Sequence, residues 1–383
     1  MKIIDCLVKV IVIAKGGIKV MKALFEKVKL NEKIELRNRF VMAPMTTYSA
    51  NEDDTVSDEE IAYYKERASG AGMIITACAY VAANGKAFPG QIAAHEDHYI
   101  PSLQRIAQAI QQGGAKAVLQ IHHGGRQSLQ HLVPNGDVVS ASAAITIEKN
   151  EARPLTLDET KQIIKAYGEA TRRAIQAGFD GVEIHGANTY LIQQFYSAFT
   201  NKRTDEYGGT IEKRMRFPLE IVEEVLKNKN MYADESFIVG YRFSPEEPEE
   251  DGITMDHTIM LVDELAKTEL TYLHISLGDF RSETHRYEKG QQNRISAIQS
   301  LLDGRKPLIG VGSIYTVEEA EHALQLGSDL VALGRALLIE PHWVEKVQKG
   351  EKVNTAYNEN VDTVLPSPLL KRLQSRPGWV PGF

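Results

Sequence analysis

Three side chains that could polarise an oxygen and supply a proton lie close together between Val182 and Tyr190. His185 and Asn188 are three positions apart where a buried apolar run ends, so both could donate hydrogen bonds to one oxygen of a bound molecule. Such donors would make the β-carbon of an unsaturated carbonyl or nitro compound electrophilic. Tyr190 is a candidate acid, because a phenol with a pKa of about 10 stays protonated at neutral pH. The alternative for an isolated histidine or tyrosine is a structural role.

The elements that must position these residues recur along the chain as short apolar runs, each followed by a stretch with helical periodicity. Buried parallel strands are typically near-continuous apolar runs. The pattern predicts strands at Phe40–Met45, Met73–Tyr80, Ala117–His122, Gly181–His185, Phe237–Phe243, Tyr272–Leu277, Pro307–Val311 and Leu330–Gly334. Helical periodicity is clear at Leu103–Gln112, Thr160–Ala177, Ile211–Leu226, Met255–Ala266 and Thr316–Leu326. Eight such repeats predict an α/β fold, a single (β/α)8 TIM barrel.

A doubly wound sheet is the competing fold, and it would show a glycine-rich turn after an early strand. The nearest match, Gly70-Ala71-Gly72, precedes a strand instead. Lys27–Leu36 predicts a hairpin around Asn31, which we expect to close the barrel floor. We expect the barrel to occupy residues 21–350 and a C-terminal tail to follow at residues 351–383.

Residues 1–20 are expected to be an N-terminal extension outside the core. The run from Ile3 to Ala14 is apolar but contains Asp5 and Lys9, and it is too short to span a bilayer. A short amphipathic helix or a signal remains the alternative for this segment.

Composition excludes several classes of function. The net charge of −7 argues against a general nucleic-acid binder, which needs a basic face. The two cysteines, Cys6 and Cys78, are too few for an iron–sulfur cluster or an all-cysteine zinc site. This cysteine usage fits a reducing cytosol, so we expect a cytoplasmic protein with no membrane or nucleic-acid partner and no metal.

The last two predicted strands end where TIM barrels commonly bind a phosphate group. Loops after strands 7 and 8 form the recurrent phosphate cradle of TIM barrels, and here they carry Gly312-Ser313 and Gly334-Arg335. Glycines let backbone N–H groups approach an anion, and an arginine can bind it bidentately. The alternative is that these glycines only turn the chain.

The order and spacing of several motifs resemble the Old Yellow Enzyme family from about Phe25 to Trp343. The motifs are Asn38–Met45, His123–Arg126, Val182–Tyr190 and Asn201–Glu212. The resemblance implies FMN across the barrel mouth and NAD(P)H as electron donor. Its implied cofactor-binding residues are Gly312, Ser313, Gly334 and Arg335 at the phosphate, Pro44, Met45, Thr46 and Ala77 along the isoalloxazine, Gln120 at the pyrimidine edge and Arg242 at the N1/O2 locus.

Physical chemistry supports the place of Arg242 independently. Reduced flavin is anionic near N1, so a fixed guanidinium stabilises it. The alternative for Arg242 is a structural ion pair. His122 and His123 are adjacent, so in a strand they face opposite ways, and we expect His123 to be a structural or flavin-side residue.

The resemblance also implies a reaction and two substrate contacts. Hydride would pass from NAD(P)H through flavin N5 to an activated alkene (an enone, maleimide or nitro compound) by a ping-pong mechanism, with the proton coming from Tyr190. Tyr48 resembles a substrate-contacting tyrosine. Arg376 lies in a tail that resembles those inserted into a neighbouring subunit's site, which would make the protein a homo-oligomer. A solvated tail is the alternative.

Other functions stay open at this point. The same site could serve an FMN reductase or demethylase, or an FMN-binding protein without turnover. A non-redox lyase or isomerase acting on a phosphorylated substrate would need a base at a strand end. Glu183 is the candidate, although it lies deeper in strand 4 and could instead be an ion-pair partner inside the barrel. The physiological oxidant, the choice between NADH and NADPH and the oligomeric state are not determined.

Overall fold

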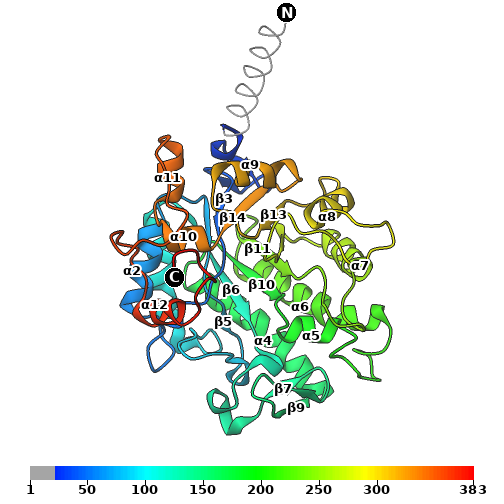
Figure 1. Cartoon of the computed structure of the whole chain (residues 1–383). Helices are drawn as coiled ribbons and strands as arrows, with labels where there is room; N and C mark the ends of the chain where they lie inside the picture. Colours follow the sequence, from blue (N-terminus) through cyan, green and yellow to red (C-terminus); the bar gives the residue numbers. More distant parts are fainter. Residues whose placement is uncertain (1–21) are drawn as a thin grey trace, which may run out of the picture.

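The structure is a computed structural model that describes residues 22–383, so the expected extension at residues 1–20 lies outside the described residues. Parallel strands form a closed barrel in which the last strand pairs with the first. In chain order they are β3 (Phe40–Met42), β4 (Met73–Ile75), β6 (Lys116–His122), β10 (Gly181–Gly186), β11 (Ile238–Phe243), β12 (Tyr272–Ile275), β13 (Leu308–Val311) and β14 (Leu330–Leu333). Figure 1 shows the helices surrounding these strands. The predicted (β/α)8 barrel is confirmed.

The helices between the strands bury one face against the barrel. They are α2 (Asp58–Arg67), α3 (Ile100–Gln112), α4 (Leu157–Gln176), α6 (Ile211–Tyr232), α7 (Met255–Ala266), α8 (Arg294–Leu302), α9 (Val317–Gln325), α10 (Arg335–Ile339) and α11 (Trp343–Gln348). Threonines at 156, 254 and 316 begin three of them with capping boxes, which satisfy exposed N–H groups of the first turn. The five helices expected from periodicity are present, and the prediction was too short for α6, whose last turns are polar and carry no apolar signal.

The N-terminal hairpin closes the barrel floor, as expected. It consists of β1 (Val28–Lys29) and β2 (Glu35–Leu36), which pair antiparallel. The Asn31 carboxamide oxygen accepts hydrogen bonds of 2.8 Å from the N–H groups of Lys33 and Ile34, which fixes the turn. Leu30, Ile34 and Leu36 of the hairpin pack into one apolar cluster with side chains from inside the barrel, including Met73 and Tyr272.

Several elements carry no clear signal in the sequence pattern. An excursion after β6 contains the three-stranded sheet of β7 (Val139–Ser140), β8 (Ala144–Ile145) and β9 (Glu151–Pro154). The predicted strand Met73–Tyr80 is instead divided into β4 and the short strand β5 (Ala79–Tyr80), both of which pair with β6. The helix α5 (Leu191–Tyr196) follows β10. None of these disturbs the barrel order.

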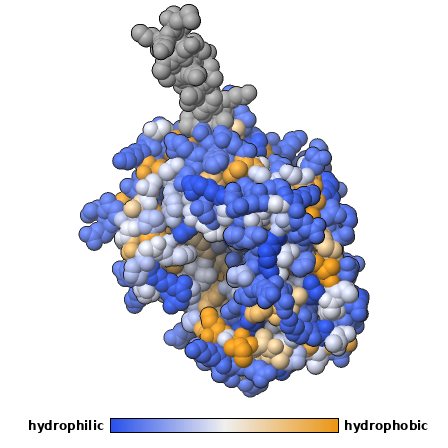
Figure 2. Space-filling view, turned by 45° about the vertical axis from the view of Figure 1, so that its right-hand side comes forward, coloured by the Kyte–Doolittle hydropathy of each residue, from blue (hydrophilic) through white to orange (hydrophobic). Residues whose placement is uncertain are grey.

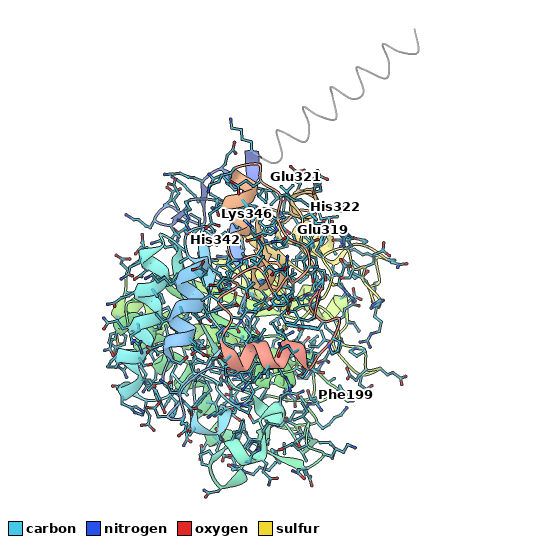
Figure 3. All side chains as sticks on the ribbon, turned by 60° about the vertical axis from the view of Figure 1, so that its left-hand side comes forward. Phe199, Glu319, Glu321, His322, His342 and Lys346 are labelled. Atoms are coloured by element: carbon cyan, nitrogen blue, oxygen red, sulfur yellow. The ribbon has the colours of Figure 1, made fainter. Side chains whose placement is uncertain are left out.

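The C-terminal tail folds back onto the barrel through α12 (Ser367–Gln374), which lies beside α2 across the open end (Figures 1 and 3). The Glu59 carboxylate on α2 accepts hydrogen bonds from the Ser367 N–H and hydroxyl, at 2.9 and 2.7 Å. The buried Arg67 donates to the carbonyl of Thr363 at 2.6 Å. These contacts hold the tail at the carboxyl ends of the strands, where barrel chemistry is located.

The surface is largely hydrophilic, with hydrophobic side chains in separate patches (Figure 2). Within residues 22–383, no helix combines the length and apolarity needed to cross a membrane. The same described residues hold no cluster of three or more histidine, cysteine or acidic side chains arranged to bind a metal ion.

Candidate active site

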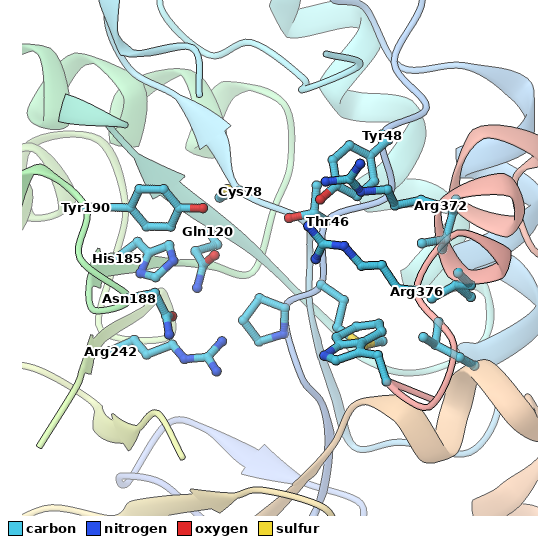
Figure 4. Close-up of a pocket in the computed structure, with 16 residues that line it drawn as sticks. Thr46, Tyr48, Cys78, Gln120, His185, Asn188, Tyr190, Arg242, Arg372 and Arg376 are labelled. Atoms are coloured by element: carbon cyan, nitrogen blue, oxygen red, sulfur yellow. The ribbon is translucent and has the colours of Figure 1, made fainter. Parts of the chain in front are cut away.

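Two adjoining cavities lie at the carboxyl ends of the strands. The first, of about 250 Å³, brings together ten of the residues that the sequence indicated (Figure 4): Pro44, Met45, Thr46, Tyr48, Gln120, His185, Asn188, Tyr190, Arg242 and Arg376. Its lining also includes Cys78, Leu338, Leu369, Arg372, Leu373 and Trp379. The second, of about 470 Å³, shares Pro44, Met45, Asn188, Arg242 and Trp379 with the first and adds Gly312, Ser313, Gly334 and Arg335.

Ala77 is the one indicated residue outside both linings. It is buried, and its N–H donates a 2.7 Å hydrogen bond to the hydroxyl of Tyr64 on α2. Its neighbour Cys78 lines the first cavity instead. A contact between Ala77 and the isoalloxazine therefore stays a prediction.

The turn after β10 brings its three polar residues to one cavity. Asn188 and Thr189 have φ angles of 57° and 63°, a left-handed conformation that is uncommon for residues other than glycine. Hydrogen bonds hold this turn, since the Asn188 N–H donates to the Ser244 hydroxyl at 2.9 Å and the Thr189 carbonyl accepts from Gln194 at 2.7 Å. The turn thus fixes Asn188 and directs the following Tyr190 back toward the barrel axis.

His185 is a neutral hydrogen-bond donor in this site. Burial, reinforced by His122 and Arg242, holds its pKa well below the usual value. Its Nδ1 accepts a long, 3.4 Å hydrogen bond from the Ala187 N–H, which assigns the ring proton to Nε2. A neutral imidazole with its proton on Nε2 can polarise an oxygen without transferring charge.

His122, which the sequence did not single out, packs behind the other two rings. Its centroid lies 5.6 Å from that of His185 and 4.2 Å from that of Tyr190, in an edge-to-face contact with the tyrosine. Its Nδ1 lies 3.0 Å from the amide nitrogen of Gln91, which is a donor, so the proton of His122 is on Nε2. His123 faces the other way, toward Asn84.

Tyr190 keeps its proton over the physiological range. Burial raises the pKa of its phenol above the usual value, and its ring lies 5.0 Å from His185. Burial likewise raises the pKa of the Cys78 thiol to about 12, so this second unpredicted residue is also protonated. The groups nearest the centre of the first cavity are therefore neutral donors.

Arg242 supplies a buried positive charge beside them. It pairs in register with His185 across β10 and β11 and donates to the Ser276 hydroxyl at 3.2 Å. Its Nε has no hydrogen-bond partner among the described residues, and no carboxylate of that part of the chain lies within ion-pair distance. This leaves donor capacity for an anionic ligand, as the electronegative edge of a flavin would require.

Glu183 lies beneath the site and has no access to it. Its carboxylate accepts a 2.7 Å hydrogen bond from Gln120 and contacts His274 Nδ1 at 2.8 Å. Burial opposes its ionisation, but His274 and Arg242 hold the pKa of Glu183 below the usual value. It is thus a buried hydrogen-bond partner inside the barrel, as the interior role that the sequence left open requires, and it lines neither cavity.

The second cavity is lined by the two glycines, the serine and the arginine that the sequence indicated for a phosphate site. Gly312 has a φ of 134°, and a Cβ there would come within 2.8 Å of the Phe280 nitrogen, so only glycine fits. The Ser313 hydroxyl donates to the Gly278 carbonyl at 2.6 Å and accepts from Arg335. Arg335 also donates to the Trp379 carbonyl at 3.0 Å. A phosphate-terminated cofactor with a polar, electron-accepting ring fits the two cavities together.

Comparison with known proteins agrees with this geometry. Residues 23–354 match the model of the NADH:flavin oxidoreductase / NADH oxidase family. The probable NADH-dependent flavin oxidoreductase YqiG of Bacillus subtilis (strain 168) is 50% identical over 364 residues, 94% of this chain and 98% of that protein. The NADH:fumarate oxidoreductase of Klebsiella pneumoniae (strain 342) is 44% identical over 83% of this chain, which spans only 35% of that larger protein.

Solved structures show the same relationship. The Old Yellow Enzyme homologue from Zymomonas mobilis superposes with a TM-score of 0.77 at 26% identity, covering 90% of this chain and 99% of the other.

Fold, cavities and relatives together define a flavin-dependent barrel oxidoreductase that takes its electrons from NAD(P)H, with FMN as its cofactor. The chain belongs to the NADH:flavin oxidoreductase / NADH oxidase family, that of the Old Yellow Enzymes. The lyase or isomerase alternative is therefore wrong.

Proposed function

We propose that the protein reduces activated alkenes, such as enones, maleimides or nitro compounds, by a ping-pong mechanism. The observation that carries this proposal is the meeting of His185, Asn188 and Tyr190, all neutral donors, in one cavity that adjoins the cavity lined by Gly312, Ser313, Gly334 and Arg335. Fumarate, named in the Klebsiella relative, is itself an activated alkene. The alternative is an FMN reductase or demethylase acting at the same site.

The residues that would hold FMN divide between the two cavities. Gly312, Ser313, Gly334 and Arg335 would bind its phosphate, while Pro44, Met45, Thr46 and Ala77 would line its ring and Gln120 and Arg242 would bind its polar edge. FMN supplies the hydride acceptor and donor that link NAD(P)H to the alkene. Because both substrates use one face, no separate dinucleotide-binding domain is needed.

The protein's own residues then act on the bound alkene. The His185 Nε2–H and the Asn188 amide donate to its carbonyl or nitro oxygen and stabilise the charge that develops there. The Asn188 amide nitrogen lies 3.1 Å from the Ser276 hydroxyl, which leaves one of its two N–H groups for the substrate. Tyr190 transfers its proton to the α-carbon, and Tyr48 and Arg376 contact the rest of the molecule.

Tyr190→Phe tests this division of labour. We expect reduction of cyclohexenone to fall by about 100-fold or more, since general acid catalysis typically contributes about 10²–10⁴-fold. Oxidation of NAD(P)H by the enzyme in single turnover should be unchanged, because that step needs no proton from the phenol. Tyr232→Phe, a change on the exposed end of α6, serves as the matched control. Unaltered turnover of cyclohexenone by Tyr190→Phe would refute the acid role.

We further propose that the protein is cytoplasmic and forms a homo-oligomer. The mildly acidic net charge and the sparse cysteines support the location. In the described chain Arg376 reaches the cavity of its own subunit, so insertion into a neighbour stays a prediction. Light scattering on the FMN-bound protein tests it, and a monomer at micromolar concentration would contradict it.

A further inference from the structure

The C-terminal tail brings two guanidinium groups into the first cavity. Arg372 lies in the last turn of α12 and Arg376 follows the helix by two residues, and both line the cavity together with Tyr190 (Figure 4). The Arg372 guanidinium lies over the ring of Tyr48, 5.6 Å from its centroid. An outer cavity of about 720 Å³ continues from this point, and Lys371 adds a third positive charge to its lining.

Arg372 and Arg376 differ from the other arginines because their side chains have no hydrogen-bond or ion-pair partner among residues 22–383. Every other arginine of the chain donates to a carboxylate, a hydroxyl or a backbone carbonyl. Arg372 and Arg376 make no side-chain hydrogen bond or ion pair with any residue of the described part, 22–383. An arginine side chain carries five N–H donors, so both retain their full capacity to bind an anion.

No acidic residue balances this charge. Neither the first cavity nor the outer cavity is lined by an aspartate or glutamate. The absence does not follow from composition, because the chain has 51 acidic against 44 basic residues. Arg242 in the same cavity adds to the positive charge. The phosphate of FMN cannot be the missing partner, since its donors Ser313 and Arg335 line the second cavity.

Both arginine side chains are exposed, so water can satisfy their donors, and the position of Arg372 has a second simple explanation. A cation in the last turn of a helix is stabilised by the helix dipole, which applies to Lys371 and Arg372. This explanation does not reach Arg376, which lies beyond the helix, and it does not account for the missing carboxylates. Two convergent guanidinium groups beside a substrate cavity are the arrangement that binds carboxylate or phosphate.

We propose that Arg372 and Arg376 form an anion-binding site for the molecule that docks beside Tyr190. The proposal rests on the alkene-reductase function and narrows its substrates to those that carry an anionic group. That group is either a carboxylate of the alkene or the diphosphate of NAD(P)H, because both molecules use this cavity in turn.

A pair of substrates that differ only in charge tests the site. Cinnamaldehyde bearing a para-carboxylate is compared with its para-carboxamide, which has the same shape and no charge. In the wild-type enzyme we expect kcat/KM to favour the carboxylate by about 10-fold or more. Arg372→Gln and Arg376→Gln should each lower this preference by up to about 10-fold, to a ratio near one, because each removes one charge-assisted hydrogen bond. Arg376→Lys should retain part of it.

The control and a second readout separate this site from general electrostatics. Lys267→Gln removes one positive charge from the far surface and should leave the preference unchanged. Equilibrium binding of both aldehydes to the oxidised, FMN-bound enzyme, measured by calorimetry, gives the preference without turnover. Rising salt should weaken binding of the carboxylate and not of the carboxamide.

The outcomes distinguish the source of the anion. Loss of the carboxylate preference in the variants assigns the anion to the alkene. An unchanged preference with a KM for NAD(P)H raised by a similar factor assigns it to the diphosphate. If the variants alter neither, the anion site is wrong while the alkene-reductase function stands. If the wild type reduces neither aldehyde, that function is wrong, and the calorimetric preference still decides the anion site.

Discussion

Glu60, on α2 beneath the loop that follows β3, should make the protein less stable as pH rises, and Glu60→Gln should remove this effect. The side chain is fully buried. One carboxyl oxygen accepts a hydrogen bond from the hydroxyl of Thr47, and the other has no partner among the described residues. Burial therefore raises the pKa of Glu60 to about 7, above the value of 4.5 of a free side chain.

The size and sign of the effect follow from linkage between protonation and folding. Between pH 4.5 and 7 the folded protein holds a proton on Glu60 that the unfolded chain has lost, so stability falls as pH rises through this window. A difference of about 2.5 pH units, at about 1.4 kcal/mol per unit, amounts to about 3 kcal/mol. Above pH 7 the wild type bears this full cost, because the carboxylate is ionised in an apolar site. Glutamine, which is never ionised, does not.

Urea unfolding followed by circular dichroism at pH 5 and pH 8.5 measures this difference. We expect Glu60→Gln to be about as stable as the wild type at pH 5 and more stable by about 3 kcal/mol at pH 8.5. The comparison at each pH cancels every other titrating group. Glu223→Gln, an exposed change on α6, should show no such pH dependence. A stability difference that is the same at both pH values would refute the reasoning.

Two further predictions concern the strand ends. Gly186→Ala should destabilise the fold by about 1–3 kcal/mol and lower the melting temperature, because a Cβ at this position would lie 2.3 Å from the Tyr241 hydroxyl oxygen. An unchanged melting temperature would contradict this close packing. Arg335→Ala should weaken FMN binding by about 10- to 100-fold, measured as quenching of Trp379 fluorescence because Trp379 lines both cavities. Trp379→Phe provides the control, and equal affinity in Arg335→Ala would exclude a phosphate contact.

The barrel could be predicted from the sequence because its signals are local. Buried parallel strands are short and continuously apolar, and glycines mark where helices end, as at Gly178 and Gly327. Ten of the eleven residues expected around the flavin ring and substrate line the first cavity for the same reason: each ends a strand or follows one directly, apart from Arg376. Ala77, the exception, is buried one residue before the position that reaches the cavity.

The remaining parts of the site depend on long-range packing that no local pattern encodes. The prediction for residues 351–383 is only a tail, without the helix α12 or its docking on α2, so the convergence of Arg372 with Arg376 was not foreseen. The alternation within a strand correctly separated His122 from His123, yet it does not say which of them faces the reacting groups. That choice is set by the turn after β10, which brings Tyr190 against His122.

The charge states in the first cavity explain why two kinds of donor are needed. Burial keeps His185 neutral, so it can stabilise an oxygen that gains negative charge but cannot give up a proton without becoming an unstable anion. In the proposed reaction the proton would therefore come from another group, and Tyr190 is protonated and lies beside His185. Negative charge on the intermediate would then be balanced by the guanidinium groups that line the same cavity, Arg242 from the barrel and Arg376 from the tail. Because burial moves the pKa values of His185 and Tyr190 away from neutrality, in opposite directions, alkene reduction should be nearly independent of pH between about 6 and 8.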